Sequence, residues 1–290
     1  MVESRRCKIT ENFDLSKRMY DSSCISDYMG CPRLFYYAWI RRLKTKEDDP
    51  SMRFGSVWHD VMLEWYKTGS AEKAAKFFSQ LPSGVTADHK TKGWGEAIFK
   101  EYIERYPDEP GRTLHLEKVF RIAIGDKLYG GRIDRIENWN DQIYVDDHKT
   151  SARLGAQFFD RFRPHVQIDG YCRACKEVVG RCQGAIINGI STAKNPKDRF
   201  QRFPSSRTEW ELQNFDKVFS DWTDDIERDV KRNYFPMKTN YCTYWGKKCR
   251  FWEICVYGDT QEYVEKAIAQ NFVVDEVKSD SNNDGRSEQR

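Results

Sequence analysis

Two runs rich in β-forming residues, 129–136 and 144–151, constrain the fold of this chain more than any other feature. A polar, turn-prone segment, 137–142, joins them, so we expect two adjacent strands of a hairpin. Side chains alternate between the two faces of a strand, which places Asp147 and Lys149 at the end of an otherwise apolar row. A carboxylate and an ammonium are costly in that position unless they bind something.

Asp134, on the first of these strands, can reach the same place as Asp147. Two carboxylates that converge from paired strands are suitable ligands for a hard divalent cation. A neighbouring lysine can stabilise the charge of a phosphate during its transfer. Asp146 points to the opposite face and is expected to be secondary. The alternative is a surface hairpin with ordinary ion pairs, and Asp-x-Lys by itself favours that alternative.

The composition bounds the class of protein. A chain of 290 residues suits one large domain, or a core with a helical extension. No apolar run approaches the roughly 18 residues of a membrane-spanning helix, and the N-terminus lacks the apolar core of a signal peptide. We therefore expect no membrane association and a cytoplasmic location, or the host cytoplasm if the protein is viral.

Local charge is more informative than the net charge of +3, which is too small to imply a polyanionic partner. Basic clusters at 41–46, 194–202 and 247–250 lie close to aromatic residues. This mixture is typical of surfaces that bind nucleic-acid backbones and stack bases. Solvated loop charges are the alternative for each single cluster.

The periodicity predicts an α/β arrangement. Helices are expected at 22–30, from Pro32 to Trp39, and at 54–66, 71–80, 94–106, 165–179, 208–234 and 262–270. The helix at 54–66 carries an apolar stripe at helical spacing, Phe54, Val57, Trp58, Val61, Met62 and Trp65, and Gly180 is expected to end the helix at 165–179. Strands are expected at 113–124, in the hairpin, at 184–190 and near 200–203. The polar tail from residue 275 onward is expected to be disordered.

Nine cysteines, an odd number, without a signal peptide indicate metal binding rather than a disulfide framework. Cys31 lies at a helix start before Pro32, and a group of three, Cys242, Cys249 and Cys255, follows the long helix. The pair Cys172 and Cys175 lies on a helix and is interpreted as ordinary core residues.

Four motifs follow one another on the expected elements. They are Gly55-Ser56-Val57-Trp58-His59 on a helix, Gly131-Arg132-Ile133-Asp134 on a strand, Asp147-His148-Lys149-Thr150-Ser151 on the next strand, and Gln167-Ile168-Asp169-Gly170-Tyr171 on a later helix. Their order resembles the PD-(D/E)XK nuclease superfamily. The most similar branch holds RecB-type nuclease domains and the iron–sulfur exonucleases of CRISPR adaptation. The resemblance covers roughly 22–258.

The resemblance implies a restriction-endonuclease-like core, with a mixed sheet flanked by helices, and roles for individual residues. Asp134, Asp147 and the carbonyl of His148 would hold Mg²⁺ or Mn²⁺, and His59 would complete a manganese-tolerant site. Lys149 would orient the attacking water or stabilise the phosphate, while Gln167 and Tyr171 would position Lys149 and the DNA strand. The helical spacing agrees with these roles. Gly55 and His59, like Gln167 and Tyr171, are four residues apart and so lie on one helical face. The small residue Gly55 would let its helix approach the sheet closely.

The resemblance also implies that Cys31, Cys242, Cys249 and Cys255 bind a 4Fe–4S cluster that joins the two ends of the chain. Zinc is the main chemical alternative. Cys24 could replace a ligand, but it lies about two helical turns before Cys31, which favours Cys31.

The function expected from these features is metal-dependent hydrolysis of DNA, by an exonuclease rather than a site-specific endonuclease. It would serve DNA recombination and repair, phage DNA metabolism or CRISPR adaptation. The expected substrates are single-stranded DNA or duplex ends, and the expected protein partners are a helicase, a recombinase or an integrase. The alternative is a non-catalytic nucleic-acid-binding or assembly subunit. Retention of Asp134, Asp147 and Lys149 favours the enzyme.

The expected domain organisation follows the motifs. An extension, 1–21, precedes a nuclease domain, 22–258. This domain contains a helical insertion and the cluster-binding cysteines that join the two ends of the chain (the iron–sulfur staple). A C-terminal helix, 259–274, and the tail, 275–290, follow.

Overall fold

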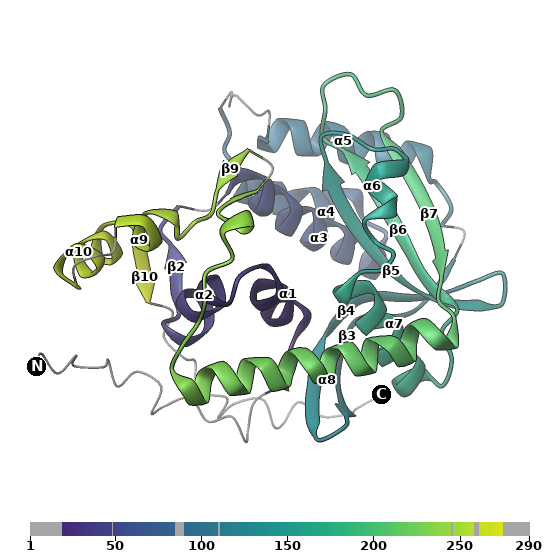
Figure 1. The fold of residues 1–290 in the computed structure, drawn as a ribbon. Helices are drawn as coiled ribbons and strands as arrows, with labels where there is room; N and C mark the ends of the chain where they lie inside the picture. The colour runs from purple at the N-terminus through teal and green to yellow at the C-terminus, as the bar shows by residue number, and fades with distance from the viewer. Residues whose placement is uncertain are drawn as a thin grey trace, which may run out of the picture. The chain divides into compact units, whose positions relative to one another are not determined.

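A six-stranded mixed sheet lies at the centre of the larger of two units into which the chain divides (Figure 1). The computed structural model describes residues 19–47, 49–84, 90–109, 111–244, 246–257 and 261–274. The described residues within 15–26 and 48–227 form the sheet unit, and those within 27–47 and 228–290 form the cysteine unit. Most of the expected N-terminal extension and the expected disordered tail lie outside the described residues.

The sheet combines parallel and antiparallel pairs, which confirms the expected α/β class with a mixed sheet. Its strands run in the order β1-β4-β5-β6-β7, and β3 also pairs with β4. The pairs β1/β4 and β5/β6 are parallel, whereas β3/β4, β4/β5 and β6/β7 are antiparallel. The strand bounds are β1 Met19–Tyr20, β3 Arg112–Ile124, β4 Lys127–Trp139, β5 Gln142–Ser151, β6 Gly184–Ser191 and β7 Phe200–Ser206.

The central hairpin, β4 and β5, turns more tightly than the sequence suggested. Only Asn140 and Asp141 connect the strands, and both have positive φ angles, 50° and 61°. Asn and Asp tolerate this left-handed region, so two residues suffice to reverse the chain. The expected turn at 137–142 is therefore wrong for its first three residues, which belong to β4, and for Gln142, which begins β5. Glu137 belongs to the sheet because it pairs with Thr113 of β3 and Tyr144 of β5, and its carboxylate lies 2.9 Å from Arg135.

Helices cover both faces of the sheet. Helix α3 packs against β3 and β5, and α7 packs against β3, β5 and β6 (Figure 1). The helices of this unit are α3 Pro50–Thr68, α4 Ala71–Ala75, the 3₁₀ helix η4 Lys76–Gln80, α5 Lys92–Arg105, α6 Ala156–Asp160, α7 Val166–Val179 and α8 Glu209–Arg232, the last with its final residues in the other unit. Gly180, with φ 89°, ends α7 as predicted.

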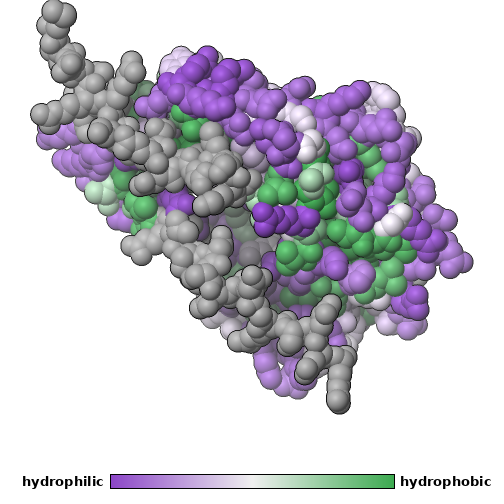
Figure 2. Space-filling model, turned by 90° about the horizontal axis from the view of Figure 1, so that it is seen from below, coloured by the Kyte–Doolittle hydropathy of each residue, from purple (hydrophilic) through white to green (hydrophobic). Residues whose placement is uncertain are grey.

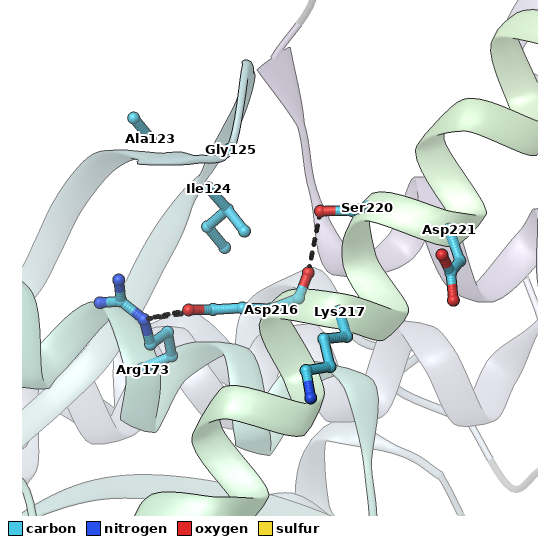
Figure 3. Close-up of a pocket in the computed structure, with 8 residues that line it drawn as sticks. All are labelled: Ala123, Ile124, Gly125, Arg173, Asp216, Lys217, Ser220 and Asp221. Atoms are coloured by element: carbon cyan, nitrogen blue, oxygen red, sulfur yellow. Dashed lines mark hydrogen bonds and ion pairs between the residues drawn. The ribbon is translucent and has the colours of Figure 1, made fainter.

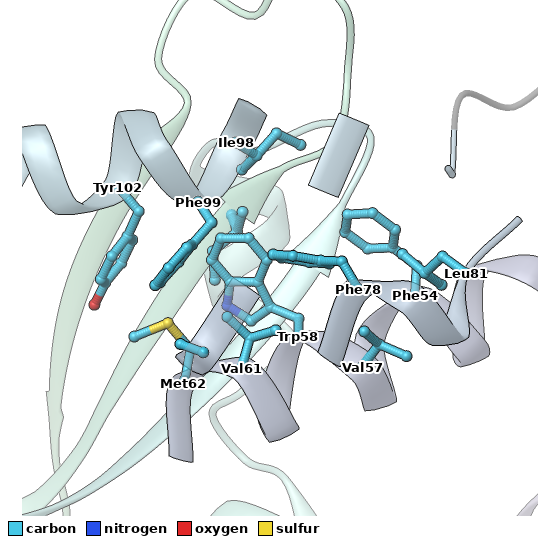
Figure 4. Packing of buried hydrophobic residues seen from close by; sticks show 12 residues of the cluster. Phe54, Val57, Trp58, Val61, Met62, Phe78, Leu81, Ile98, Phe99 and Tyr102 are labelled. Carbon is cyan, nitrogen blue, oxygen red and sulfur yellow. The ribbon is translucent and has the colours of Figure 1, made fainter. Parts of the chain in front are cut away.

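Trp58 is the centre of the helical part of the core (Figure 4). Its ring packs against Phe78, Phe99 and Tyr102 at centroid distances of 6.0 to 6.3 Å. The stripe expected along α3 is buried as predicted; its fully buried members are Phe54, Val57, Trp58, Val61 and Met62. Burial of side chains of this kind contributes about 1.5–3 kcal/mol each, so this stripe fixes α3 against α4, η4 and α5.

The cysteine unit is built from short elements around a second apolar core. Cys31 is the N-cap of α2, and Pro32 takes the first helical position, as the sequence indicated. Strand β2 pairs antiparallel with β10. The elements are the last residues of α1 Ser22–Gly30, then α2 Pro32–Phe35, the π-helix η3 Tyr36–Ile40, β2 Leu43–Thr45, η5 Thr239–Tyr241, β8 Thr243–Tyr244, β9 Lys247–Lys248, α9 Trp252–Tyr257, α10 Gln261–Asn271 and β10 Phe272–Val274. The buried residues of this core are Cys31, Leu34, Tyr37, Leu43, Phe251, Ile254, Ala267, Ile268 and Phe272.

The surface seen in Figure 2 alternates between hydrophilic areas and smaller hydrophobic areas. Among the described residues, no helix combines the length and the apolar character needed to cross a membrane.

Candidate active site

Lys149, near the end of β5, lies between a carboxylate and an amide. Its Nζ is 3.0 Å from Asp147 Oδ1 and 2.8 Å from Oδ2, and it donates to Gln167 Oε1 at 2.9 Å. Asp147 is 1% exposed, whereas Lys149 is partly exposed. The two residues point to the same side because they are two apart on one strand. The ammonium is thus held in one place by two side chains and can still be reached from solvent.

Asp134, on β4, lies next to the position of Asp147 across the hairpin, because its neighbour Arg135 pairs with Asp146 in the strand register. His59 Nδ1, on α3, is 2.8 Å from Asp134 Oδ2. Burial by itself lowers the pKa of His59, but the hydrogen bond and the charge of Asp134 outweigh it and raise that pKa. Burial likewise raises the pKa of Asp134, and His59 and Lys149 reverse this and lower it.

Helix α7 supplies the next residues of the site. Gln167 Nε2 donates to the hydroxyl of Tyr171 at 3.3 Å, so the two residues, four apart, share one helical face as the sequence predicted. Burial raises the pKa of Tyr171 to about 12, so its hydroxyl is protonated at neutral pH. The structure therefore brings Asp147, Lys149, Gln167 and Tyr171 into one connected row of contacts.

Helix α3 runs close to the end of β5, as the small residue Gly55 indicated. A Cβ added to Gly55 would lie 3.4 Å from Thr150 Oγ1, which is a close but ordinary contact. This close approach allows the imidazole of His59 on α3 to reach Asp134 on β4.

The donors of this site fit a divalent metal by their chemistry. Two carboxylates, an imidazole and a carbonyl are the oxygen and nitrogen ligands that Mg²⁺ and Mn²⁺ accept. Asp147 Oδ2 is buried and makes no well-aligned hydrogen bond with the described residues, although the Lys149 ammonium is near it. As the described side chains are placed, no three of the His, Cys, Asp and Glu residues form a metal-binding group. A bound ion would therefore require the candidate ligands to move from the positions they have here.

A buried ionic network that the sequence did not indicate lies on the opposite side of the hairpin. Arg135 is 2% exposed and lies 2.7 Å from Asp146 Oδ2. Asp146 also accepts a hydrogen bond from Asn188 of β6. Asp146 is thus occupied by structural partners, and its secondary role in the site stays a prediction. The network escaped sequence reasoning because its members come from three strands and form no local motif.

The four cysteines predicted to bind one cofactor line a single small pocket in the cysteine unit. Its walls are Cys31, Cys242, Cys249 and Cys255, together with Leu34, Met237, Tyr241, Phe251 and Trp252. Burial raises the pKa of the Cys255 thiol to about 12; Arg33 opposes this shift, and the charges of the other three cysteines add to it. Cys31 Sγ also accepts a hydrogen bond from the backbone N–H of Lys238 at 3.3 Å.

The pair on α7, Cys172 and Cys175, is fully buried, as expected of core residues. Cys24 is also buried and lies in α1, and it is not among the residues that line the cysteine pocket.

A separate open pocket of about 380 Å³ lies between the β3–β4 turn, α7 and α8 (Figure 3). Its ion pair, Arg173 with Asp216 at 3.0 Å, crosses from α7 to α8. It contains none of the residues predicted to act in catalysis. The predicted catalytic residues and this pocket therefore lie in different places.

Comparisons with known proteins identify the family of this chain. A crystal structure from Eubacterium rectale, described as that of a candidate exonuclease, aligns with a TM-score of 0.50 at 13% identity, over 90% of this chain and 94% of that one. A second crystal structure, described as SSO0001, aligns with a TM-score of 0.29 at 13% identity, over 85% of this chain and 96% of that one, and carries no argument. No curated protein matches the sequence. The family model of the PD-(D/E)XK nuclease superfamily matches residues 22–256, and the chain belongs to that superfamily.

Proposed function

We propose that this protein is a metal-dependent deoxyribonuclease that removes nucleotides from DNA ends. The observation that carries the proposal is the position of Lys149, whose ammonium is held by Asp147 and Gln167 beside Asp134 on the neighbouring strand. An ammonium placed in advance can stabilise the negative charge that develops on a phosphate during hydrolysis. Membership of the superfamily supports phosphodiester hydrolysis as the reaction.

The roles of the chain's own residues follow from their contacts. Asp134, Asp147 and the carbonyl of His148 would hold Mg²⁺ or Mn²⁺, with His59 as a further ligand. Such an ion, when bound, lowers the pKa of a bound water and neutralises charge on the phosphate. Lys149 binds the phosphate oxygens or orients the water, and Gln167 restricts the ammonium to one position. Tyr171, hydrogen-bonded to Gln167, keeps the amide oxygen turned toward Lys149.

DNA ends are the proposed substrate because one structural neighbour is described as a candidate exonuclease. The basic and aromatic clusters supply side chains that bind a nucleic-acid backbone. In the cluster 247–250, Lys248 Nζ lies 3.9 Å from the centroid of the Trp252 ring. Recombination, phage DNA metabolism and CRISPR adaptation all require such end processing, with a helicase, recombinase or integrase as the protein partner.

We further propose that Cys31, Cys242, Cys249 and Cys255 bind a 4Fe–4S cluster. The support is that all four thiols line one pocket, although they come from two distant parts of the chain. Soft thiolates in an apolar enclosure suit iron–sulfur chemistry, and zinc remains the chemical alternative. The colour of the purified protein distinguishes the two.

End-labelled single-stranded and duplex DNA, beside a covalently closed circle, test the enzymatic proposal. With Mn²⁺, the linear substrates should release labelled mononucleotides or short oligonucleotides while the circle stays intact. A chelator should abolish the reaction. Cutting of the circle would replace the exonuclease with an endonuclease. Tight DNA binding without cleavage under any divalent metal would instead favour the non-catalytic binding subunit.

A further inference from the structure

Helix α3 is attached to the catalytic hairpin at a second point besides His59. Tyr66 follows His59 by seven residues, which is two helical turns, so both side chains leave the same face of the helix. The hydroxyl of Tyr66 lies 3.0 Å from Nε2 of His148, between Asp147 and Lys149 on β5. His59 therefore contacts β4, and Tyr66 contacts β5.

The contacts beyond Tyr66 decide which atom donates each proton. The hydroxyls of Tyr66 and Tyr102 are 3.2 Å apart, and Tyr102 donates to Glu109 Oε1 at 3.1 Å. Glu109 also forms an ion pair of 2.8 Å with Arg202, so it is the accepting carboxylate at the end of the row. Because Tyr102 gives its only proton to Glu109, Tyr66 donates to Tyr102.

The same reasoning sets the tautomer of His148. With the Tyr66 proton committed to Tyr102, the Tyr66 oxygen accepts from Nε2–H of His148. Nδ1 is then unprotonated, and this buried atom has no hydrogen-bond partner among the described residues. Buried acceptors without a partner are less rare in proteins than buried N–H donors without one.

The aromatic ring of Tyr66 also contacts the hairpin, through Arg135 of β4. The guanidinium carbon of Arg135 lies 4.2 Å from the centroid of this ring, within the range of a cation–π interaction. Arg135 is fixed in turn by its ion pair of 2.7 Å with Asp146. A buried polar network with its partners in place restricts the side chains it contains to one arrangement.

We propose that Tyr66 is a positioning residue of the nuclease site, which holds the His148 imidazole and thereby fixes the backbone of β5 between Asp147 and Lys149. The inference rests on the proposed function, because that backbone carries the carbonyl proposed as a metal ligand. Partners that orient the ligands of a metal site commonly contribute 10–100-fold to metal affinity or activity. Tyr66 thus acts on the metal through His148 without touching it.

Tyr66→Phe tests the inference because it removes only the hydroxyl and keeps the ring beneath Arg135. The variant leaves Nε2–H of His148 without its acceptor. Mn²⁺ binding, measured by isothermal titration calorimetry, should weaken by about tenfold, and kcat for DNA cleavage should fall. Tyr144→Phe, on the same strand as His148, is the matched control. The Tyr144 ring packs against Trp139 at a centroid distance of 6.4 Å, and the Mn²⁺ affinity of this variant should stay unchanged.

Two substitutions of His148 separate positioning from packing. In His148→Gln the amide N–H₂ takes the place of the Nε2–H donor, so Mn²⁺ affinity should stay within about threefold of wild type, less than the loss typical of such partners. In His148→Leu the donor is absent, and Mn²⁺ affinity should fall as in Tyr66→Phe. Wild-type Mn²⁺ affinity in Tyr66→Phe, with only a lowered Tm, would overturn the inference and leave Tyr66 a structural role. A wild-type protein that neither binds Mn²⁺ nor cuts DNA would overturn the proposed function itself, and the inference with it.

Discussion

Lys149 and Asp147 lie two residues apart on one strand, with the lysine ammonium 2.8 Å from one carboxylate oxygen and 3.0 Å from the other. Such a contact on an exposed strand would be an ordinary ion pair worth little. Here the carboxylate is 1% exposed and the ammonium has a second partner, Gln167, from a helix that packs on the strand. The ammonium is therefore restricted to one position, which is what the proposed catalytic role of Lys149 requires.

The first prediction concerns Gln167. Gln167→Ala removes the Oε1 contact of 2.9 Å while Lys149 keeps Asp147, so the ammonium becomes less restricted. Loss of such positioning should lower kcat by about 10–100-fold, with little change in Tm. Single-turnover cleavage and differential scanning fluorimetry provide the two measurements. Glu177→Ala, an exposed change on the same helix, is the control, and equal kcat values for the two variants would contradict the role of Gln167.

The second prediction concerns His59, which has an alternative role as a boundary residue of the core. If His59 is a metal ligand, His59→Ala should raise the Mn²⁺ concentration needed for half-maximal cleavage by about tenfold or more. The measurement is cleavage rate against Mn²⁺ concentration. An unchanged Mn²⁺ requirement with a lowered Tm would assign His59 to packing and to its 2.8 Å ion pair with Asp134.

The third prediction concerns the cysteine pocket. A metal bound by Cys31 and the three late cysteines closes a loop that contains most of the chain, and its binding energy becomes folding energy. Cys31→Ala should therefore lower Tm by roughly 10 °C or more. Cys172→Ala should be milder, although that thiol is fully buried.

The metal itself is tested by purification in the absence of oxygen. A 4Fe–4S cluster should give a brown protein that bleaches with dithionite and contains iron and sulfide. A colourless protein with one zinc per chain would support a metal bound by the four cysteines and reject the iron–sulfur cluster. A stable protein without either metal, and with Cys31→Ala as stable as wild type, would reject both.

The fourth prediction concerns pH. Burial, and then the charge of Lys149, lowers the pKa of His165 to about 4 from its usual 6.5. As pH falls, the unfolded chain takes up this proton before the folded one, so the stability from neutral His165 is complete above about pH 6.5 and is lost toward pH 4. The loss amounts to about 2–3 kcal/mol.

His165→Asn isolates this contribution. His165 is the N-cap of α7, and its Nδ1 accepts from the backbone N–H of Ile168 at 3.4 Å, a role that the oxygen of Asn can take over. The variant should therefore lose less stability between pH 7 and pH 4 in urea titrations. A pH dependence equal to that of wild type would contradict the assignment. Part of the wild-type dependence should remain, because the pKa of buried His148 is also lowered.

Sequence reasoning located the elements of this fold where local patterns were strong. The stripe along α3, the helix start at Pro32 and the glycine that ends α7 depend on neighbours in the chain, and the structure confirms them. The turn at Asn140 and Asp141 was placed too broadly, because Glu137 looks like a turn residue until its buried partner Arg135 is known.

The site could be predicted only as far as its motifs extend. Asp134, Asp147 and Gln167 belong to motifs with fixed spacing, whereas Tyr66 contacts His148 across 82 positions of the chain. A partially buried tyrosine on an amphipathic helix carries no signal of that contact in a single sequence. The divalent metal of the active site and the iron–sulfur cluster stay predictions, because neither is part of the amino-acid chain.

The central claim is tested most directly by the rate at which Asp147→Asn cuts an end-labelled duplex in Mn²⁺, with DNA affinity measured on the same preparation. The substitution replaces a buried carboxylate with a neutral group of nearly the same shape, so the hairpin should keep its fold. Cleavage should fall by several orders of magnitude, as it should in Lys149→Ala, because both side chains matter most in the transition state. DNA affinity should change by no more than about threefold, as expected for residues that contribute little to ground-state binding. Wild-type cleavage by both variants would show that the catalytic centre lies elsewhere in the protein.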